Sequence, residues 1–321
     1  MARVSMADVA ARAGVSAQTV SRVVNGSPRV DPATRARVEE AMEALGYRMH
    51  RAARALRTGR TRTIGLVVST LASVGNSRML QAVAEAAGAR DYALTIVTVT
   101  GTRAVAEGFA HLHDQGVDGA IVLNEATMLA RDTEPPAGLG IVVVDSAPDD
   151  RFAIVQTDHA GGARDAVAYL LEQGHDTVHH LAGPASSFAA AERERGWREA
   201  LVGAGAFVPE PVRGDWTSHS GYAAGGALAA ASAVFVANDQ MSLGLLRALA
   251  EAGRRVPEDT AVVGFDDVVD AADYRPPLTT MRQDFDALGA EAVAALVAMI
   301  ERAEPPARVT VPATLVVRAS A

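Results

Sequence analysis

The chain has 321 residues and a formal net charge of -8, and it contains 49% hydrophobic and 21% charged residues. This length favours about two or three domains with sizeable cores. The lack of cysteine excludes disulfides and thiolate metal sites. No apolar run is long enough to span a bilayer and no secretion signal is evident, so we expect a cytoplasmic protein that does not contact membranes.

The charge is divided unevenly along the chain. Residues 1–62 hold 12 arginines and 5 acidic residues, a net charge of +7. Residues 63–321 hold 18 arginines and 33 acidic residues, a net charge of -15. A basic N-terminal segment on an acidic body is typical of a nucleic-acid-binding module joined to a domain with another task.

The basic segment begins with three predicted helices. Ser5 can cap the first helix, and Gly14 permits the turn that follows. Ser16 can cap a second helix that extends to about Asn25. An Asp-Pro pair and a later glycine bound the third helix, over residues 32–45. This pattern predicts an all-α helix-turn-helix domain within residues 1–47.

The second helix carries side chains suited to reading DNA. Gln18 and Arg22 lie one turn apart and would project together. An amide and a guanidinium group match the adenine and guanine edges in the major groove. We therefore expect this helix to bind double-stranded DNA.

Residues 48–62 join the helical segment to the body. Arg51, Arg54 and Arg57 repeat every three positions around Ala53 and Leu56. A helix this short is marginal in water on its own. The residues alone are compatible with either a basic linker or a helix that forms on DNA.

From residue 63 onward, short apolar runs alternate with helical segments. The strand-like runs are 63–69, 93–99, 119–123, 141–146, 177–183, 233–239 and 261–267, and the main helical segments are 77–91, 160–173, 188–203 and 240–252. This alternation predicts parallel sheets covered by helices on both faces, and its restart near residue 157 predicts two similar α/β subdomains. The cleft between them is the expected ligand site.

Polar residues close several of these runs. They are Asp145, Asn238, Asp239, Asp266 and Asp267. Carboxylates and amides beside an arginine and the indole of Trp216 are typical of a carbohydrate site, because they pair with hydroxyls while the ring covers an apolar sugar face. A cap or turn role explains Asp239 and Asp267 better than ligand binding does.

The stretch DVAARAGVSAQTVSRVVNG, followed by TRARVEEAMEALGY, resembles the N-terminal signature of the lac repressor family of transcriptional regulators. The resemblance implies that residues 48–62 form a hinge helix when two subunits meet on DNA, with Leu56 wedged into the minor groove. Ala17 replaces a larger reading residue, so the operator sequence can differ. The implied DNA-binding residues are Ser16, Ala17, Gln18, Thr19, Ser21, Arg22, Asn25, Arg51, Ala53 and Leu56.

The body resembles the effector-binding region of the same family in LAGPASSFAAAERERGW, GDWTSHSGY, VANDQMSLG and VVGFDDVVDAADYRPPLTTMRQDF. This resemblance implies a periplasmic-binding-protein-like body over residues 63–321. Its N-subdomain spans about 63–156 plus 284–311, and its C-subdomain about 157–283 plus 312–321. The implied effector-binding residues are Leu71, Asp145, Arg193, Trp216, Asn238, Asp266, Gln283 and Phe285.

The resemblance implies a homodimeric repressor that needs no cofactor. It would bind near-palindromic operator DNA and be released by a small sugar, with a galactoside favoured. Ser73, Asn76 and Met79 replace apolar pocket residues of the family, and Thr157 replaces an aromatic one, so the sugar can differ. The chain ends without the leucine repeat of tetrameric members, which is why we expect a dimer.

Other functions stay open at this point. Within the family, the effector can be another sugar or a purine. A sugar-binding transport protein would share the body, but the basic helical segment and the absence of a secretion signal count against it. A glycoside-cleaving enzyme would need Asp145 and Asp266 at a defined separation, and the attached DNA-binding domain argues against catalysis.

Five histidines raise the question of a metal site. They are His111, His113, His175, His179 and His180. The first two lie on a predicted surface helix and the others flank a strand, without paired carboxylates at ligand spacing. We predict structural roles for them and no metal.

Overall fold

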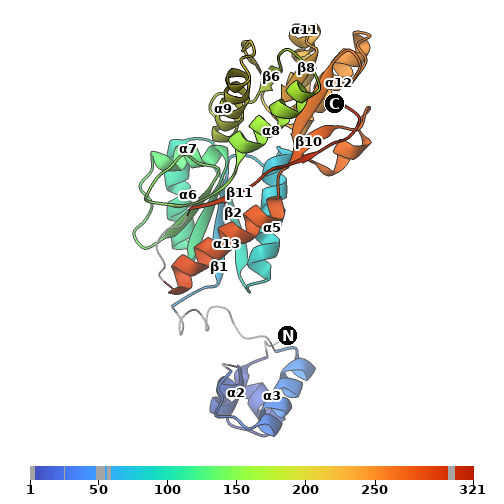
Figure 1. The fold of residues 1–321 in the computed structure, drawn as a ribbon. Coiled ribbons are helices and arrows are strands. Elements are labelled where there is room, and N and C mark those ends of the chain that lie inside the picture. The colour runs from blue at the N-terminus through green and yellow to red at the C-terminus, as the bar shows by residue number, and fades with distance from the viewer. Residues whose placement is uncertain (1–3, 25, 48–54, 56–58, 303–307) are drawn as a thin grey trace. The chain divides into compact units, whose positions relative to one another are not determined.

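The computed structural model describes residues 4–24, 26–47, 55, 59–302 and 308–321 (Figure 1). The chain divides into two compact units, Met1–Thr61 and Arg62–Ala321, which we call the N-terminal unit and the body. Among the described helices, none combines the length and the apolar character needed to cross a membrane.

The N-terminal unit contains helices α1 (Met6–Ala13), α2 (Ala17–Val24) and α3 (Pro32–Leu45). Their ends follow the predicted capping signals. Ser5 Oγ accepts from the backbone N–H of Asp8, and Gly14 adopts φ 65° in the turn after α1. Val20 and Val38 are fully buried in the small core between the helices. The helix-turn-helix fold is therefore confirmed.

The body contains two six-stranded sheets. Sheet A has the order β11-β5-β4-β3-β1-β2 and sheet B the order β12-β10-β9-β8-β6-β7. The strands of sheet A are β1 (Thr63–Val68), β2 (Ala93–Thr98), β3 (Gly119–Leu123), β4 (Gly140–Val144), β5 (Ala153–Thr157) and β11 (Arg308–Val311). Those of sheet B are β6 (His179–Ala182), β7 (Val212–Arg213), β8 (Ala233–Val236), β9 (Ala261–Asp266), β10 (Thr279–Arg282) and β12 (Thr314–Val316).

Helices cover both faces of each sheet (Figure 1). On sheet A, α5 (Val74–Gly88) and α13 (Phe285–Arg302) pack on one face, and α6 (Thr102–Asp114) and α7 (Glu125–Arg131) pack on the other. On sheet B, α8 (His159–Glu172) and α9 (Phe188–Gly203) lie opposite α10 (Ser218–Ala223), α11 (Gly225–Leu228) and α12 (Asp239–Glu251). A short 3-10 helix, η1 (Val269–Asp273), follows β9.

The buried strands explain why the sequence predicted this architecture. In β3, Ile121 and Leu123 belong to the core beneath α5 and α13, whereas Ala120 and Val122 belong to the core beneath α6 and α7. A parallel strand buried on both faces has no polar alternation, so it appears as a continuous apolar run. The mixed α/β fold with parallel sheets is confirmed.

The structure shifts some predicted boundaries. Helix α5 begins at Val74 and not at residue 77, because Ser73 Oγ accepts from the backbone N–H of Asn76 and caps it. Helix α2 ends at Val24, and Asn25 lies outside the described residues. Among the elements that the apolar runs did not reveal are short or partly exposed strands such as β7 and β11.

Candidate functional site

The outward surface of α2 is the candidate DNA-binding face. Ser16 Oγ accepts from the backbone N–H of Thr19 at 3.1 Å and holds the start of the helix. Ala17, Gln18 and Arg22 are exposed, whereas the valines on the opposite side of the helix are buried. Ser21 is partly buried. The structure therefore presents the predicted reading residues on one side of a short, capped helix.

Four predicted DNA-binding residues lie outside the described part of the chain. They are Asn25, Arg51, Ala53 and Leu56. Their roles, and the hinge helix, remain predictions from the sequence.

The main cavity of the body lies between the two sheets, at the carboxyl ends of their strands. The space that its walls enclose, including solvent at the open side, is about 590 Å³. Seven of the eight predicted effector-binding residues line it: Asp145, Arg193, Trp216, Asn238, Asp266, Gln283 and Phe285. Leu71 is the exception. It lies in the loop before α5, 37% exposed, and does not line the cavity.

Several cavity residues sit in unusual backbone conformations. Asn124, Asp145, Trp216 and Asp266 have φ values of 47°, 57°, 74° and 116°. Non-glycine residues rarely adopt positive φ, and where they do they are often found at functional sites. The sharp turns at these strand ends bring side chains from both sheets toward one cavity.

A closed ring of polar contacts joins the two halves of the body at the cavity floor. Asp145 Oδ1 lies 2.9 Å from His159 Nε2 and accepts from the backbone N–H of Thr157 at 3.1 Å. Arg193 Nε donates to His159 Nδ1 at 3.3 Å. The ring is completed on the opposite side of the cavity by Asp266.

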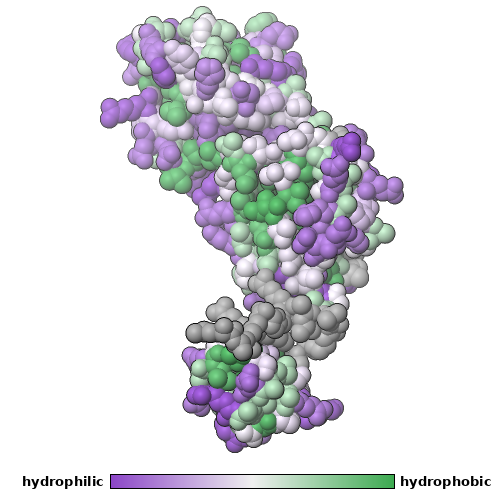
Figure 2. Space-filling model, turned by 180° about the vertical axis from the view of Figure 1, so that it is seen from behind, coloured by the Kyte–Doolittle hydropathy of each residue, from purple (hydrophilic) through white to green (hydrophobic). Residues whose placement is uncertain are grey.

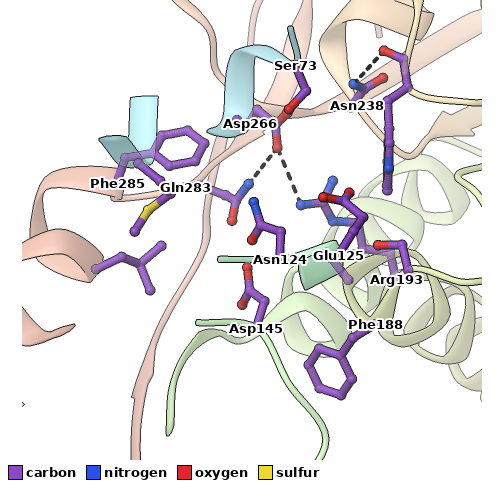
Figure 3. A pocket seen from close by; sticks show the side chains of 16 residues that line it. Ser73, Asn124, Glu125, Asp145, Phe188, Arg193, Asn238, Asp266, Gln283 and Phe285 are labelled. Atoms are coloured by element: carbon purple, nitrogen blue, oxygen red, sulfur yellow. Dashed lines mark hydrogen bonds and ion pairs between the residues drawn. The ribbon is translucent and has the colours of Figure 1, made fainter. Parts of the chain in front are cut away.

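Asp266 receives two donors in this ring. Its Oδ1 accepts from Gln283 Nε2 at 2.6 Å and lies 3.4 Å from Arg193 Nη2 (Figure 3). Gln283 Oε1 in turn accepts from the hydroxyl of Thr157 at 2.7 Å. Thr157, which occupies a position where the family resemblance implied an aromatic side chain, thus orients Gln283.

The ring balances buried charge. Burial lowers the pKa of Arg193, although Asp266 and Asp145 oppose this shift. Burial also raises the pKa of Asp266, and Arg193 and Gln283 offset this only in part. For Asp145, burial acts to raise the pKa, but His159, the Thr157 amide and Arg193 together lower it. Asp145 is therefore an ionised hydrogen-bond acceptor at neutral pH.

Aromatic rings flank Arg193. Among the described residues that line this cavity, Arg193 is the only basic one. The Arg193 guanidinium carbon lies 3.8 Å from the centroid of the Phe265 ring and 5.6 Å from that of Trp216. The indole Nε1–H of Trp216 is buried without a hydrogen-bond partner among the described residues. Phe188 and Phe285 lie on opposite sides of the cavity (Figure 3). The cavity thus combines hydroxyl-pairing groups with apolar rings.

Two of the strand-end carboxylates serve the fold. Asp239 accepts from the backbone N–H of Val268 at 2.9 Å and from the hydroxyl of Thr280 at 2.6 Å. Burial and the nearby Asp266 raise the pKa of Asp239 well above its usual value. Asp267 pairs with Arg282 and Arg318. Neither aspartate lines the cavity.

Several cavity residues were missed from the sequence, among them Asn124, Glu125 and Phe188. Asn124 and Glu125 follow β3 directly, so the strand-end pattern that indicated Asp145 could have indicated them. Phe188 begins α9, and no local pattern marks it as part of a site. Within the described residues, no group of three or more histidine, aspartate or glutamate side chains is arranged to hold a metal ion.

Comparison with known proteins identifies the family. The model for bacterial regulatory proteins of the lacI family matches residues 5–49, and that for a periplasmic binding protein-like domain matches residues 167–321. The HTH-type transcriptional regulator CelR of Thermobifida fusca is 39% identical, over 97% of this chain and 96% of CelR.

Two solved structures resemble the whole chain. The lac repressor dimer bound to operator and the anti-inducer ONPF has a TM-score of 0.87 at 33% identity and covers 99% of both chains. A CelR–cellobiose complex has a TM-score of 0.74 at 35% identity, covering 99% of this chain and 100% of the other. The chain therefore belongs to the lacI family of bacterial regulatory proteins and is a transcriptional regulator rather than an enzyme.

Proposed function

We propose that this regulator is a homodimeric repressor that binds a near-palindromic operator and is released by a neutral sugar bound in the body cavity. The exposed side of α2, with Gln18 and Arg22 one turn apart, supports operator recognition in the major groove. The likeness to a lac repressor dimer bound to operator supports the same assignment.

The observation that carries the sugar assignment is the polar ring beneath the cavity. It holds carboxylate, guanidinium and amide groups from both halves of the body in fixed directions, beside the indole of Trp216. Buried groups of this kind pair with ring hydroxyls, and a ligand lacking those hydroxyls leaves them unpaired at a large cost in affinity.

A galactoside is the first effector to test, because Asp145, Arg193, Asn238 and Asp266 match the residues that hold hydroxyls in the family. A glucoside is the second, because CelR, a similar protein, is solved with cellobiose. A purine is less suited to this cavity, because carboxylate and amide groups outnumber the aromatic faces on which a flat base would stack.

Release from DNA requires the sugar to bind one state of the body more tightly than the other. Because the ring joins both halves of the body, a sugar that contacts it would stabilise one relative position of the halves. Operator affinity and sugar affinity must then change each other by the same factor.

The body also has apolar surface suited to pairing two chains. Figure 2 shows an apolar area on the sheet A half of the body, bordered by hydrophilic surface. Ile96 lies on the edge strand β2 and is 43% exposed. Exposed apolar area beside a sheet edge often marks an interface between subunits.

Calorimetry and an operator mobility shift test this function together. Wild type is expected to bind a galactoside or glucoside and to release operator at the same sugar concentration. Arg193→Ala and Arg193→Lys should bind operator but resist release, because both lose the planar guanidinium that contacts His159 and Asp266 at the same time. Arg195→Ala is the matched control, because Arg195 lies on the same helix in exposed ion pairs that contribute little.

Two results would contradict the proposal. One is an operator complex that no neutral sugar weakens. The other is Arg193→Lys released at the same sugar concentration as wild type.

A further inference from the structure

A second chamber adjoins the cavity. It spans about 990 Å³, including solvent at its open side, and Ser73, Glu125 and Trp216 line both spaces. We call the first space the inner cavity and the second the outer chamber. Much of the wall of the outer chamber is exposed, whereas Asp145, Arg193 and most other polar residues of the inner cavity are buried. The two spaces therefore share part of their walls, and the outer chamber has the more solvent-exposed lining.

The outer chamber is rich in neutral hydrogen-bonding groups. Seven of its lining residues carry a hydroxyl or an amide without charge: Ser69, Thr70, Ser73, Ser186, Thr217, Ser218 and Gln240. None of the described residues that line it is basic, whereas Glu125 and Asp215 are acidic. This chemistry suits an uncharged polyhydroxyl group and disfavours a phosphate or a sugar acid.

Several of these groups are available to a ligand. Gln240 Oε1 accepts from Asn238 Nδ2 at 3.0 Å, but its Nε2 makes no hydrogen bond to a described residue. The hydroxyls of Ser186 and Ser218 make none within the described chain either. Gln240 thus links a residue of the inner cavity to a free donor in the outer chamber.

Two residues stand where the spaces meet. Glu125 makes one long contact, from the hydroxyl of Ser69 at 3.4 Å, so most of its acceptor capacity is free among the described residues. The buried Nε1–H of Trp216 has no partner in the described part of the chain. A buried donor without a partner is costly, and a ligand oxygen at this junction would satisfy it.

We propose that the effector contains at least two glycosyl units. The first occupies the inner cavity on the polar ring, and the second occupies the outer chamber. Glu125 and Trp216 lie beside the bond that joins the two units. The inference rests on the proposed sugar-responsive function and extends it from a sugar to a neutral disaccharide or longer saccharide.

Titration calorimetry on the full chain tests this inference. The probes are glucose and galactose, compared with cellobiose, lactose, maltose and melibiose, which contain only these two sugars. Wild type is expected to bind at least one disaccharide roughly ten-fold or more tightly than either monosaccharide. Glu125→Gln should lower the affinity for that disaccharide more than the affinity for the monosaccharide, because the substitution removes a charged acceptor and keeps the shape of the side chain.

Filling the outer chamber provides the sharper comparison. Ser218→Trp should abolish the disaccharide advantage and leave monosaccharide affinity within about two-fold. His219→Trp places the same bulk on the next, exposed residue, which does not line the chamber, and should keep the advantage.

The outcomes separate the two proposals. Equal affinity for monosaccharides and disaccharides in wild type, or an advantage that survives Ser218→Trp, would overturn the two-unit effector while leaving the sugar-responsive repressor intact. Failure of all six sugars to bind or to release operator would reject both.

Discussion

His159 Nε2 lies 2.9 Å from Asp145 Oδ1, although Asp145 follows strand β4 of sheet A and His159 begins helix α8 beside sheet B. Both side chains are almost fully buried. The same imidazole accepts from Arg193 Nε at 3.3 Å through Nδ1, so its two ring nitrogens face Arg193 and Asp145. His159 therefore positions two proposed sugar-binding residues from opposite halves of the body.

His159→Phe should lower sugar affinity by roughly ten-fold, because a lost hydrogen bond to a charged group costs about 1.5–3 kcal/mol. Operator affinity in the absence of sugar should stay within about two-fold. His159→Gln keeps a donor at this position and should recover part of the loss. Calorimetry and mobility shifts measure both quantities. Equal sugar affinity in wild type and His159→Phe would reject the positioning role.

Gly183 supports the indole of Trp216. A Cβ added at Gly183 would lie 2.4 Å from Trp216 Cη2, too close for any real contact. Gly183→Ala should displace the indole and reduce sugar affinity by roughly ten-fold, about 1.4 kcal/mol. Gly203→Ala is the control, because its Cβ would meet nothing within 4 Å. A sugar titration that gives the same affinity for both variants would contradict this prediction.

His180 should make stability depend on pH. Its ring stacks on Trp197 and Phe235, with centroids 5.2 Å and 4.9 Å away. Burial lowers the pKa of His180 to about 4. In the unfolded chain the pKa of this histidine is near 6.5. Between about pH 4 and pH 6.5 the unfolded chain therefore binds more protons at His180 than the folded chain does. The contribution of neutral His180 to the free energy of unfolding is therefore complete above about pH 6.5. It falls by roughly 3 kcal/mol as the pH drops toward 4.

Urea unfolding at several pH values between 7 and 4 measures this dependence. His180→Phe should lower the free energy of unfolding by the same amount at every pH. The reason is that the variant lacks the 2.9 Å contact between Nδ1 and the carbonyl of Phe235. It should also show a shallower decline with pH than wild type. Parallel pH profiles of stability for the two proteins would show that His180 does not cause the pH dependence.

Gln18 is predicted to read a base. It is exposed on α2, so Gln18→Ala should leave the N-terminal unit folded. Affinity for operator should fall by about 1–3 kcal/mol, whereas affinity for unrelated DNA should not change. Glu40→Ala, on the exposed side of α3, is the control. Mobility shifts on both DNAs are the measurement, and an equal loss on both would mean that Gln18 reads no sequence.

Leu56 is predicted from the sequence to wedge into the minor groove. Leu56→Ala should weaken operator binding by about ten-fold or more, because the wedge helps to keep the DNA bent. Sugar affinity should not change, since the effector cavity lies wholly within the body. If the variant shifts operator at wild-type concentrations, residues 48–62 are better described as a linker.

Much of the fold could be predicted because its signals are local. Caps such as Ser5 and Asp31 act on backbone groups three residues away. The strand-end pattern indicated Asp145, Asn238 and Asp266 without any long-range information. Arg193, Gln283 and Phe285 were assigned by family resemblance, because no periodicity marks them.

The cavity could not be assembled in the same way. His159 and Arg193 are 34 positions apart, and Thr157 and Gln283 are 126 positions apart, yet each pair is in contact. Glu125 was missed, although the strand-end pattern could have indicated it, and only the tertiary structure shows that it borders two spaces.

By itself the sequence determined the capped helices, the two-sided apolar strands and the division between a basic segment and an acidic body, since each depends on neighbouring residues or on composition. Only the tertiary structure decided which polar side chains meet. Buried charges are stable only with matched partners, and those partners come from distant strands and helices whose packing sets every distance. This is why the closed ring from Asp145 to Gln283, and the second chamber beside it, became apparent only in three dimensions.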